Sequence, residues 1–95
     1  MQISKRNGTT EPYVADKIKR AMGAAFSSVG THLADDEADR LVAGIERAMS
    51  EAAAQNGGAV AVEDVQDLVE RALMEANHYQ ELKSYILYRE DRARK

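Results

Sequence analysis

The stretch "ISKRNGTTEPYVADKIKRA" (residues 3–21) contains the change of periodicity that decides the fold. Asn7–Gly8 separates two short segments of mixed polarity, and this dipeptide tolerates positive φ at both central positions of a type I′ turn. The sequence therefore predicts a hairpin with strands at 2–6 and 10–13. From Val14 onward the apolar residues follow helical spacing, so the hairpin leads directly into a helix.

The rest of the chain predicts three more helices and one short strand. The first helix should end at Gly30, and its apolar residues at helical spacing are Val14, Ile18, Met22, Ala25, Phe26 and Val29. We expect a second helix to start near Asp35 or Asp36 and stop at 56–58, followed by a short strand at 59–62. A third helix should open at Glu63–Asp64 and stop at Asn77, and a last helix should run from about Tyr79. The expected fold class is α+β, mostly α: a four-helix bundle capped by a small two- to three-stranded β-sheet that begins with the N-terminal hairpin.

Length and composition indicate one domain over residues 1–95, with a core of small aliphatic side chains, because the chain has one Phe and no Trp. The absence of cysteine excludes disulfides and thiolate chemistry, and the only histidines, His32 and His78, are isolated, so we expect no intrinsic metal site. No apolar run approaches the roughly 18 residues of a membrane span, and no signal peptide is recognisable, so we expect a cytoplasmic protein without a membrane partner.

Charge is unevenly distributed along the chain. The formal charge is +3 over residues 1–20, −9 over 21–82 and +3 over 83–95. A compact domain can bring the two basic ends together around one anion, although separate solvated faces explain the same pattern and are favoured by charge alone. The overall acidity and the few aromatics make nucleic acid an improbable partner.

No catalytic signature is present. The chain lacks phosphate-loop, dinucleotide-binding, zinc-protease and serine-hydrolase motifs. We therefore expect that this domain is not an enzyme by itself.

Nucleotide binding without a phosphate loop remains open, because the opening stretch combines apolar residues with cations and one acid. Lys5 and Arg6 are neighbours on the expected strand, so only one of them can face the first helix, where Lys17 lies. Glu11 can accept a hydrogen bond from an exocyclic amine. A surface salt bridge of Glu11 with Lys5 or Arg6 is the competing interpretation, which physical chemistry alone favours.

Three blocks of the sequence, in this order, resemble the ATP-cone, the regulatory nucleotide-binding domain at the N-terminus of many ribonucleotide reductases. The blocks are "KRNGTTEPYVADKIKRAM" (5–22), "VEDVQDLVERALME" (62–75) and "HYQELKSYILYRED" (78–91). The resemblance runs from Ile3 to about Arg92, and it implies the same bundle-and-sheet fold. It also implies that the chain is a fragment of a longer protein, which agrees with the uncapped, helix-forming ending "YREDRARK".

The resemblance implies a nucleotide site and assigns roles within it. Ile3 and Ile18 would sandwich adenine and Glu11 would accept from its amine, whereas the remaining candidates would serve the ribose and phosphates or approach the nucleotide: Lys5, Arg6, Lys17, Val62, Gln66 and Arg89. The implied effector is ATP or dATP, with or without Mg²⁺. Gln66 replaces a histidine and Val14 an asparagine of some members, so the preference between ATP and dATP stays open.

The implied function is allosteric control of the overall activity of ribonucleotide reductase, through nucleotide-dependent assembly with its catalytic domain or subunits. Two alternatives stay open. One is a protein-interaction module with a decayed nucleotide site. The other is a cone excised from a reductase-gene repressor, a branch in which a four-cysteine zinc ribbon precedes the cone.

Overall fold

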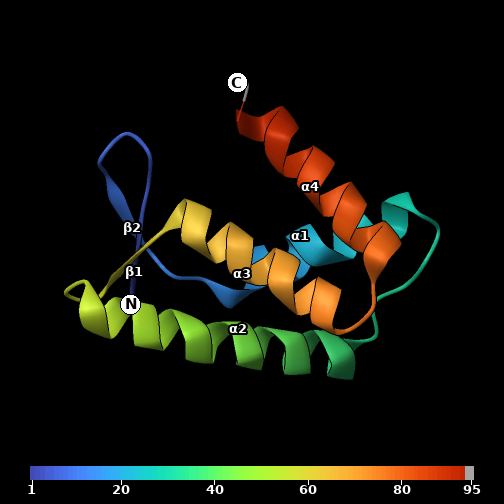
Figure 1. Ribbon diagram of the computed structural model, residues 1–95, viewed down its shortest axis with the longest axis horizontal. Coiled ribbons are helices and arrows are strands. Elements are labelled where there is room, and N and C mark those ends of the chain that lie inside the picture. Colours follow the sequence, from blue (N-terminus) through green and yellow to red (C-terminus); the bar gives the residue numbers. More distant parts are fainter. Residues whose placement is uncertain (94–95) are drawn as a thin grey trace.

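A computed structural model describes residues 1–93 as four helices beside one small sheet (Figure 1). The elements follow the chain as β1 (Gln2–Ser4), β2 (Thr10–Pro12), α1 (Ala15–Ser28), α2 (Asp35–Gln55), β3 (Ala59–Ala61), α3 (Val62–Glu75) and α4 (Tyr79–Ala93). The expected fold class is confirmed. Arg94 and Lys95, which belong to the basic C-terminal segment, lie outside the described residues.

The sheet has the order β2-β1-β3, so the first strand of the chain lies in the middle. β1 is antiparallel to β2 and parallel to β3. Ile3 is opposite Glu11 on one side and Val60 on the other, and paired residues project to the same face of a sheet. The expected third strand is therefore present, and it places the start of α3 next to the hairpin.

The hairpin turn differs from the predicted type I′ turn. Gly8 has a φ of 84°, but Asn7 is not among the residues with positive φ. The amide of Gly8 donates to the Lys5 carbonyl at 3.0 Å and the amide of Lys5 donates to the Thr9 carbonyl at 2.8 Å. This pattern is a three-residue loop in which the glycine supplies the left-handed bulge position. Both strands are consequently shorter than predicted, and Lys5 and Arg6 belong to the turn.

Two helix ends are as predicted and have the same hydrogen-bond pattern. After α1, Gly30 has a φ of 79° and the Thr31 amide reaches back to the Phe26 carbonyl at 3.0 Å. After α3, Asn77 has a φ of 66° and the His78 amide reaches the Leu73 carbonyl at 2.9 Å. Both are left-handed caps that satisfy carbonyls of the last helical turn. They set the directions in which α2 and α4 leave.

The start of α2 uses its acidic residues in a slightly different way from the expected cap. Ala34 occupies the N-cap position, while Asp35 and Asp36 are the first helical residues. Asp36 Oδ1 nevertheless accepts a hydrogen bond from the free amide of Glu37 at 3.0 Å. Carboxylates in a first turn also favour the helix dipole, so this part of the prediction holds.

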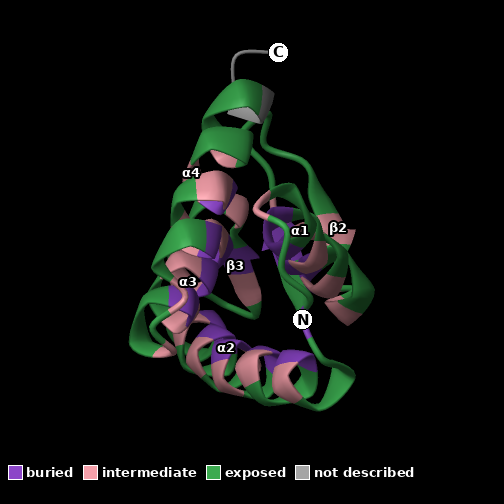
Figure 2. Cartoon of the chain, turned by 90° about the vertical axis from the view of Figure 1, so that its right-hand side faces the viewer, coloured by how far each residue is buried: buried purple, intermediate pink, exposed green. Residues whose placement is uncertain are grey.

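The core lies where the inner faces of the helices meet each other and the sheet (Figure 2). Its largest fully buried side chains are Met22, Met49, Leu73, Val60 and Val69. Val14, the first residue of the helical spacing in the sequence, is 46% exposed. It precedes α1 with an extended backbone (φ −129°, ψ 113°), so its side chain does not continue the helical stripe. Within the described residues, no helix is long and apolar enough to cross a membrane.

Candidate functional site

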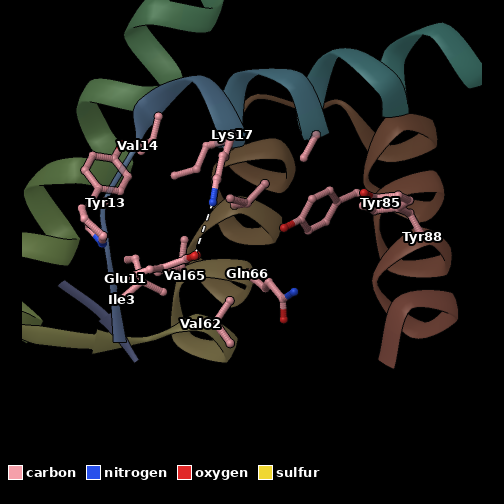
Figure 3. Close-up of a pocket in the computed structure, with 14 residues that line it drawn as sticks. Ile3, Glu11, Tyr13, Val14, Lys17, Val62, Val65, Gln66, Tyr85 and Tyr88 are labelled. Carbon is pink, nitrogen blue, oxygen red and sulfur yellow. Dashed lines mark hydrogen bonds and ion pairs between the residues drawn. The ribbon is translucent and has the colours of Figure 1, made fainter. Parts of the chain in front are cut away.

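A cavity of about 230 Å³ lies between the sheet, α1, α3 and α4 (Figure 3). The sheet contributes Ile3 and Glu11, and the segment after β2 contributes Tyr13 and Val14. α1 contributes Lys17, Ile18 and Ala21. The other walls are Val62, Val65, Gln66 and Val69 of α3, with Tyr85 and Tyr88 of α4.

Six of the nine predicted site residues line this cavity: Ile3, Glu11, Lys17, Ile18, Val62 and Gln66. Sheet register explains the first two, because residues opposite each other on paired strands face the same side. Helical spacing explains Val62 and Gln66, which are four residues apart and therefore share a face of α3. The hairpin, the first helix turn and the third helix thus converge on one space.

The charged side of the cavity is an ion-pair cluster centred on Glu11. Its Oε2 lies 3.2 Å from Lys5 Nζ and 3.4 Å from Lys17 Nζ. The pKa of Glu11 is lowered, mainly by the hydrogen bond from Lys5 and further by the charge of Lys17. The salt bridge expected from the residues alone is therefore present, and the same carboxylate also faces the cavity. The two lysine side chains are 47% and 62% exposed, so both cations are accessible from solvent.

Lys5, Arg6 and Arg89 do not line the cavity, although Lys5 reaches its Glu11. Arg6 Nε pairs with Glu63 Oε1 at 3.3 Å. Arg89 Nη1 lies 2.7 Å from Asp67 Oδ1 and 2.6 Å from Glu70 Oε2. Arg89 Nη2 also donates to the Glu63 carbonyl at 3.4 Å, so basic residues from both ends of the chain meet around the start of α3. Both arginines are therefore paired with acidic residues of α3.

The side of the cavity away from the cations is neutral and polar. Gln66 Oε1 is buried and has no hydrogen-bond partner within the described residues. Tyr85 is only 5% exposed, and burial raises the pKa of its phenol to about 12. In Figure 3 its hydroxyl points from α4 into the space between α1 and α3, near Gln66. Tyr85 and Gln66 therefore line the same cavity as uncharged polar side chains.

Sequence reasoning missed the tyrosines as cavity residues. Tyr85 lies on the last helix, 74 residues after Glu11, and this separation gave no sign that the two share a space. Tyr13 was read as a strand residue. Burial, together with the carboxylate of Glu46, raises the pKa of Tyr13, although its hydroxyl has no hydrogen-bond partner among residues 1–93.

Neither a second hollow nor a metal-binding cluster provides another candidate site among the described residues. A hollow of about 600 Å³ between α2 and α3 contains none of the predicted site residues. No group of three or more His, Asp or Glu side chains is placed to hold a metal ion in residues 1–93.

The sequence profile of the family described as the ATP cone domain matches residues 1–94. The chain belongs to the ATP cone domain family. This match covers the hairpin, the whole cavity and all four helices, so the family's domain corresponds to the complete fold described above. ATP cones bind nucleotide effectors, and the cavity of this cone is the candidate site.

Curated relatives of this cone are much longer proteins. It is 45% identical over 98 residues to the ribonucleoside-diphosphate reductase subunit alpha of Treponema pallidum, covering 100% of this chain and 12% of that protein. It is 33% identical over 100 residues to the subunit of the same name from Chlamydia muridarum, covering 99% of this chain and 10% of that protein. The cone thus spans about a tenth of the relatives it matches.

Proposed function

We propose that this ATP cone binds ATP or dATP in the cavity between the sheet and α1, and thereby controls the overall activity of a cytoplasmic ribonucleotide reductase through subunit assembly. The observation that carries the proposal is that apolar walls, the Glu11 carboxylate and Lys17 line a single cavity, while a second accessible lysine, Lys5, pairs with the same carboxylate. The similarity to two ribonucleoside-diphosphate reductase alpha subunits supports a ribonucleotide reductase as the parent enzyme.

The apolar part of the cavity suits a base. Ile3 and Ile18 are both 7% exposed and both line the cavity, one from the sheet and one from α1. Its volume of about 230 Å³ is below the roughly 300–1,000 Å³ of pockets that enclose whole ligands. In our proposal the base is enclosed between these walls, while the phosphates extend toward solvent.

Glu11 selects adenine over guanine. The lowered pKa keeps its carboxylate ionised at neutral pH, so it acts only as an acceptor. Adenine presents an exocyclic amine at the position where guanine presents a carbonyl oxygen. A carboxylate accepts from the amine but repels the carbonyl, and a charge-assisted hydrogen bond is stronger than a neutral one.

Lys5 and Lys17 provide the phosphate contacts. Both now pair with Glu11 at 3.2 and 3.4 Å, and both are largely solvent-exposed. Exposed ion pairs of this kind contribute about 0–1 kcal/mol, so a triphosphate can take over the lysines at little cost. Arg6, paired with Glu63 beside the hairpin turn, is the next cation along this edge. We place any accompanying Mg²⁺ on the phosphates rather than on protein ligands.

Control of the reductase requires that the two effectors favour different assembly states. An effector shifts an equilibrium only by its difference in affinity between the states, and the coupling is reciprocal. In this proposal the cone is the sensing domain of a longer chain, and catalysis resides elsewhere in that chain. The coverage of about a tenth of the relatives supports this division.

Calorimetric titration of this chain with ATP, dATP and GTP tests the proposal. We expect both adenine nucleotides to bind with dissociation constants below about 1 mM, and GTP to bind at least tenfold more weakly. Circular dichroism establishes that the sample is folded. No adenine-nucleotide binding by a folded sample overturns the proposal and leaves the interaction module with a decayed site.

The proposed control of the reductase through subunit assembly has to be tested on the full-length parent enzyme. Mass photometry of that enzyme with ATP and with dATP should give different distributions of assembly size. The same measurement after deletion of residues 1–93 should give one distribution with both effectors. Identical distributions from the intact enzyme contradict control through assembly.

A further inference from the structure

Tyr85 is a buried residue of α4 at the wall of the cavity. The residue as a whole is only 5% exposed, and it lines the cavity together with Gln66 of α3. The hydroxyl borders the cavity, and Figure 3 shows it directed away from α4 toward the middle of that space.

The surroundings of Tyr85 determine which part of a ligand it can meet. The cations Lys5 and Lys17 lie together with Glu11 on the sheet side. The described residues that line the cavity from α3 and α4 carry no charge, and Gln66 is the polar residue of α3 among them. Phosphates therefore belong on the sheet side, and the uncharged nucleoside belongs beside the tyrosine.

The protonation state of Tyr85 makes it a donor. Burial is the main reason that its pKa rises to about 12, with the carboxylates of Glu70 and Asp67 also raising it and Arg89 lowering it. The other α4 tyrosine at the cavity, Tyr88, adds to the upward shift. At neutral pH the phenol thus retains its proton, which it can donate to an acceptor atom of a base or sugar.

Tyr85 is also next to the contact that holds α4 on α3. Arg89, one turn after Tyr85, pairs with Asp67 and Glu70. Glu70 is one turn after Gln66, so the polar side of the cavity and this contact occupy consecutive turns of both helices. We refer to Arg89, Asp67 and Glu70 as the α3–α4 clasp. A group bound between Gln66 and Tyr85 lies directly beside it.

We propose that Tyr85 donates a hydrogen bond to the nucleoside part of the bound nucleotide and is the residue through which α4 senses an occupied cavity. This inference rests on the proposed function, because it requires a nucleotide in the cavity. It adds a binding residue from the last helix and a route from the cavity to the α3–α4 clasp.

The test compares Tyr85→Phe with the wild-type chain and with a matched control, Tyr79→Phe. Tyr79 is on the same helix but is 60% exposed, and its hydroxyl donates to Asn77 outside the cavity. Calorimetry is performed with ATP and with adenosine. Tyr85→Phe should raise both dissociation constants by the same factor, about three- to tenfold, since one neutral hydrogen bond to the nucleoside is lost. Tyr79→Phe should change neither.

A second readout addresses α4 itself. In the wild-type chain, saturating ATP should slow amide hydrogen exchange in residues 85–91, and Tyr85→Phe should lose most of this protection even when saturated. NMR of ring-labelled tyrosines in the unmodified chain provides a measurement independent of any variant. The Tyr85 signals should shift on ATP addition, while those of Tyr79 stay in place.

The outcomes separate the two proposals. Wild-type ATP binding that is unchanged in Tyr85→Phe, or a Tyr85 ring signal that does not respond to bound ATP, overturns the role of Tyr85 and leaves nucleotide binding intact. No binding by the wild-type chain overturns the proposed function, and the inference about Tyr85 with it.

Discussion

Ile3 on β1 and Glu11 on β2 stand directly opposite each other, and both side chains enter the same cavity. Side chains in this relation have their Cβ atoms about 4.5–5.5 Å apart. The backbone ladder of the sheet therefore sets the spacing between an apolar wall and a carboxylate. A base that stacks on an apolar side chain and donates a hydrogen bond from its edge to a carboxylate requires a fixed spacing between those two side chains.

Replacing Glu11 by glutamine should reduce the discrimination between ATP and GTP. Glutamine can donate to the guanine carbonyl, whereas the carboxylate only accepts. We expect the ratio of the GTP and ATP dissociation constants to fall about tenfold, as for the loss of one charge-assisted hydrogen bond. The ratio is the useful quantity, because freeing Lys5 and Lys17 strengthens binding of every triphosphate. Calorimetry with both nucleotides measures it.

Glu51→Gln is the matched control for this change of charge. Glu51 is exposed on α2 and borders the hollow between α2 and α3, away from the cavity. Its replacement should leave the ratio unaltered. Equal discrimination by the wild-type chain and Glu11→Gln contradicts adenine selection by this carboxylate.

Lys17→Gln should weaken binding of the triphosphate but not of the nucleoside. Lys17 lies at the cavity rim and its side chain is 62% exposed, so its interaction with phosphate is screened by salt. We expect the ATP dissociation constant to rise about five- to twentyfold at low salt, and the adenosine constant to change less than twofold. Titrations at two salt concentrations should show a smaller salt dependence in the variant.

Lys19→Gln is a control from the same helix. Lys19 Nζ pairs with Asp39 Oδ1 at 2.7 Å and does not line the cavity. This variant should bind ATP like the wild-type chain. A loss of affinity as large as that of Lys17→Gln points to general surface charge rather than a phosphate contact.

Arg89→Gln should affect stability more than nucleotide binding. The guanidinium is 20% exposed and forms the α3–α4 clasp with Asp67 and Glu70. Loss of these contacts should lower the free energy of unfolding by about 1–2 kcal/mol, as measured by urea unfolding. The ATP dissociation constant should change less than threefold.

A double-mutant cycle with Glu70→Gln shows whether the clasp is the cause. The two single changes should be less than additive in unfolding free energy, since both remove one shared contact. A large loss of ATP affinity in Arg89→Gln with unchanged stability favours instead the direct nucleotide contact that the family resemblance implies.

Stability at alkaline pH should depend on Tyr85. Its pKa is about 12 in the folded chain and about 10 when unfolded, so the folded state retains the proton longer. The stability that this pKa difference contributes is fully present below pH 10 and is lost as the pH rises toward 12. The total loss of stability is about 2–3 kcal/mol at most. Urea unfolding at pH 9 and pH 11.5 should show a smaller fall in stability for Tyr85→Phe than for the wild-type chain. A fall of the same size in both excludes Tyr85 as its source.

Local sequence signals predicted most elements because each depends on near neighbours. Gly30 and Asn77 end their helices in the left-handed conformation, as single residues of those types commonly do. The pairing of Lys5 with Glu11 also followed from two nearby strand positions. Such relations are contained within a few residues of the sequence.

Relations that depend on distant segments were predicted less well. The turn at Asn7–Gly8 admits two loop lengths, and the hydrogen bonds of the folded hairpin select the longer one. Arg89 was assigned to the nucleotide by resemblance, but its geometry is dominated by Asp67 and Glu70 of α3. The packing of α4 against α3, which places Tyr85 at the cavity, has no local signature.

The middle position of β1 has a consequence for the order of folding. β1 is synthesised before both of its partner strands, and β2 can pair with it after only a short turn. Its other edge waits for Ala59–Ala61, which are more than fifty residues later. Parallel pairing over such a separation is slow, because the chain loop must close before any contact is gained. One edge of β1 therefore stays unpaired until α2 and β3 have been synthesised, because β3, which follows α2 in the chain, is the strand that pairs with this edge.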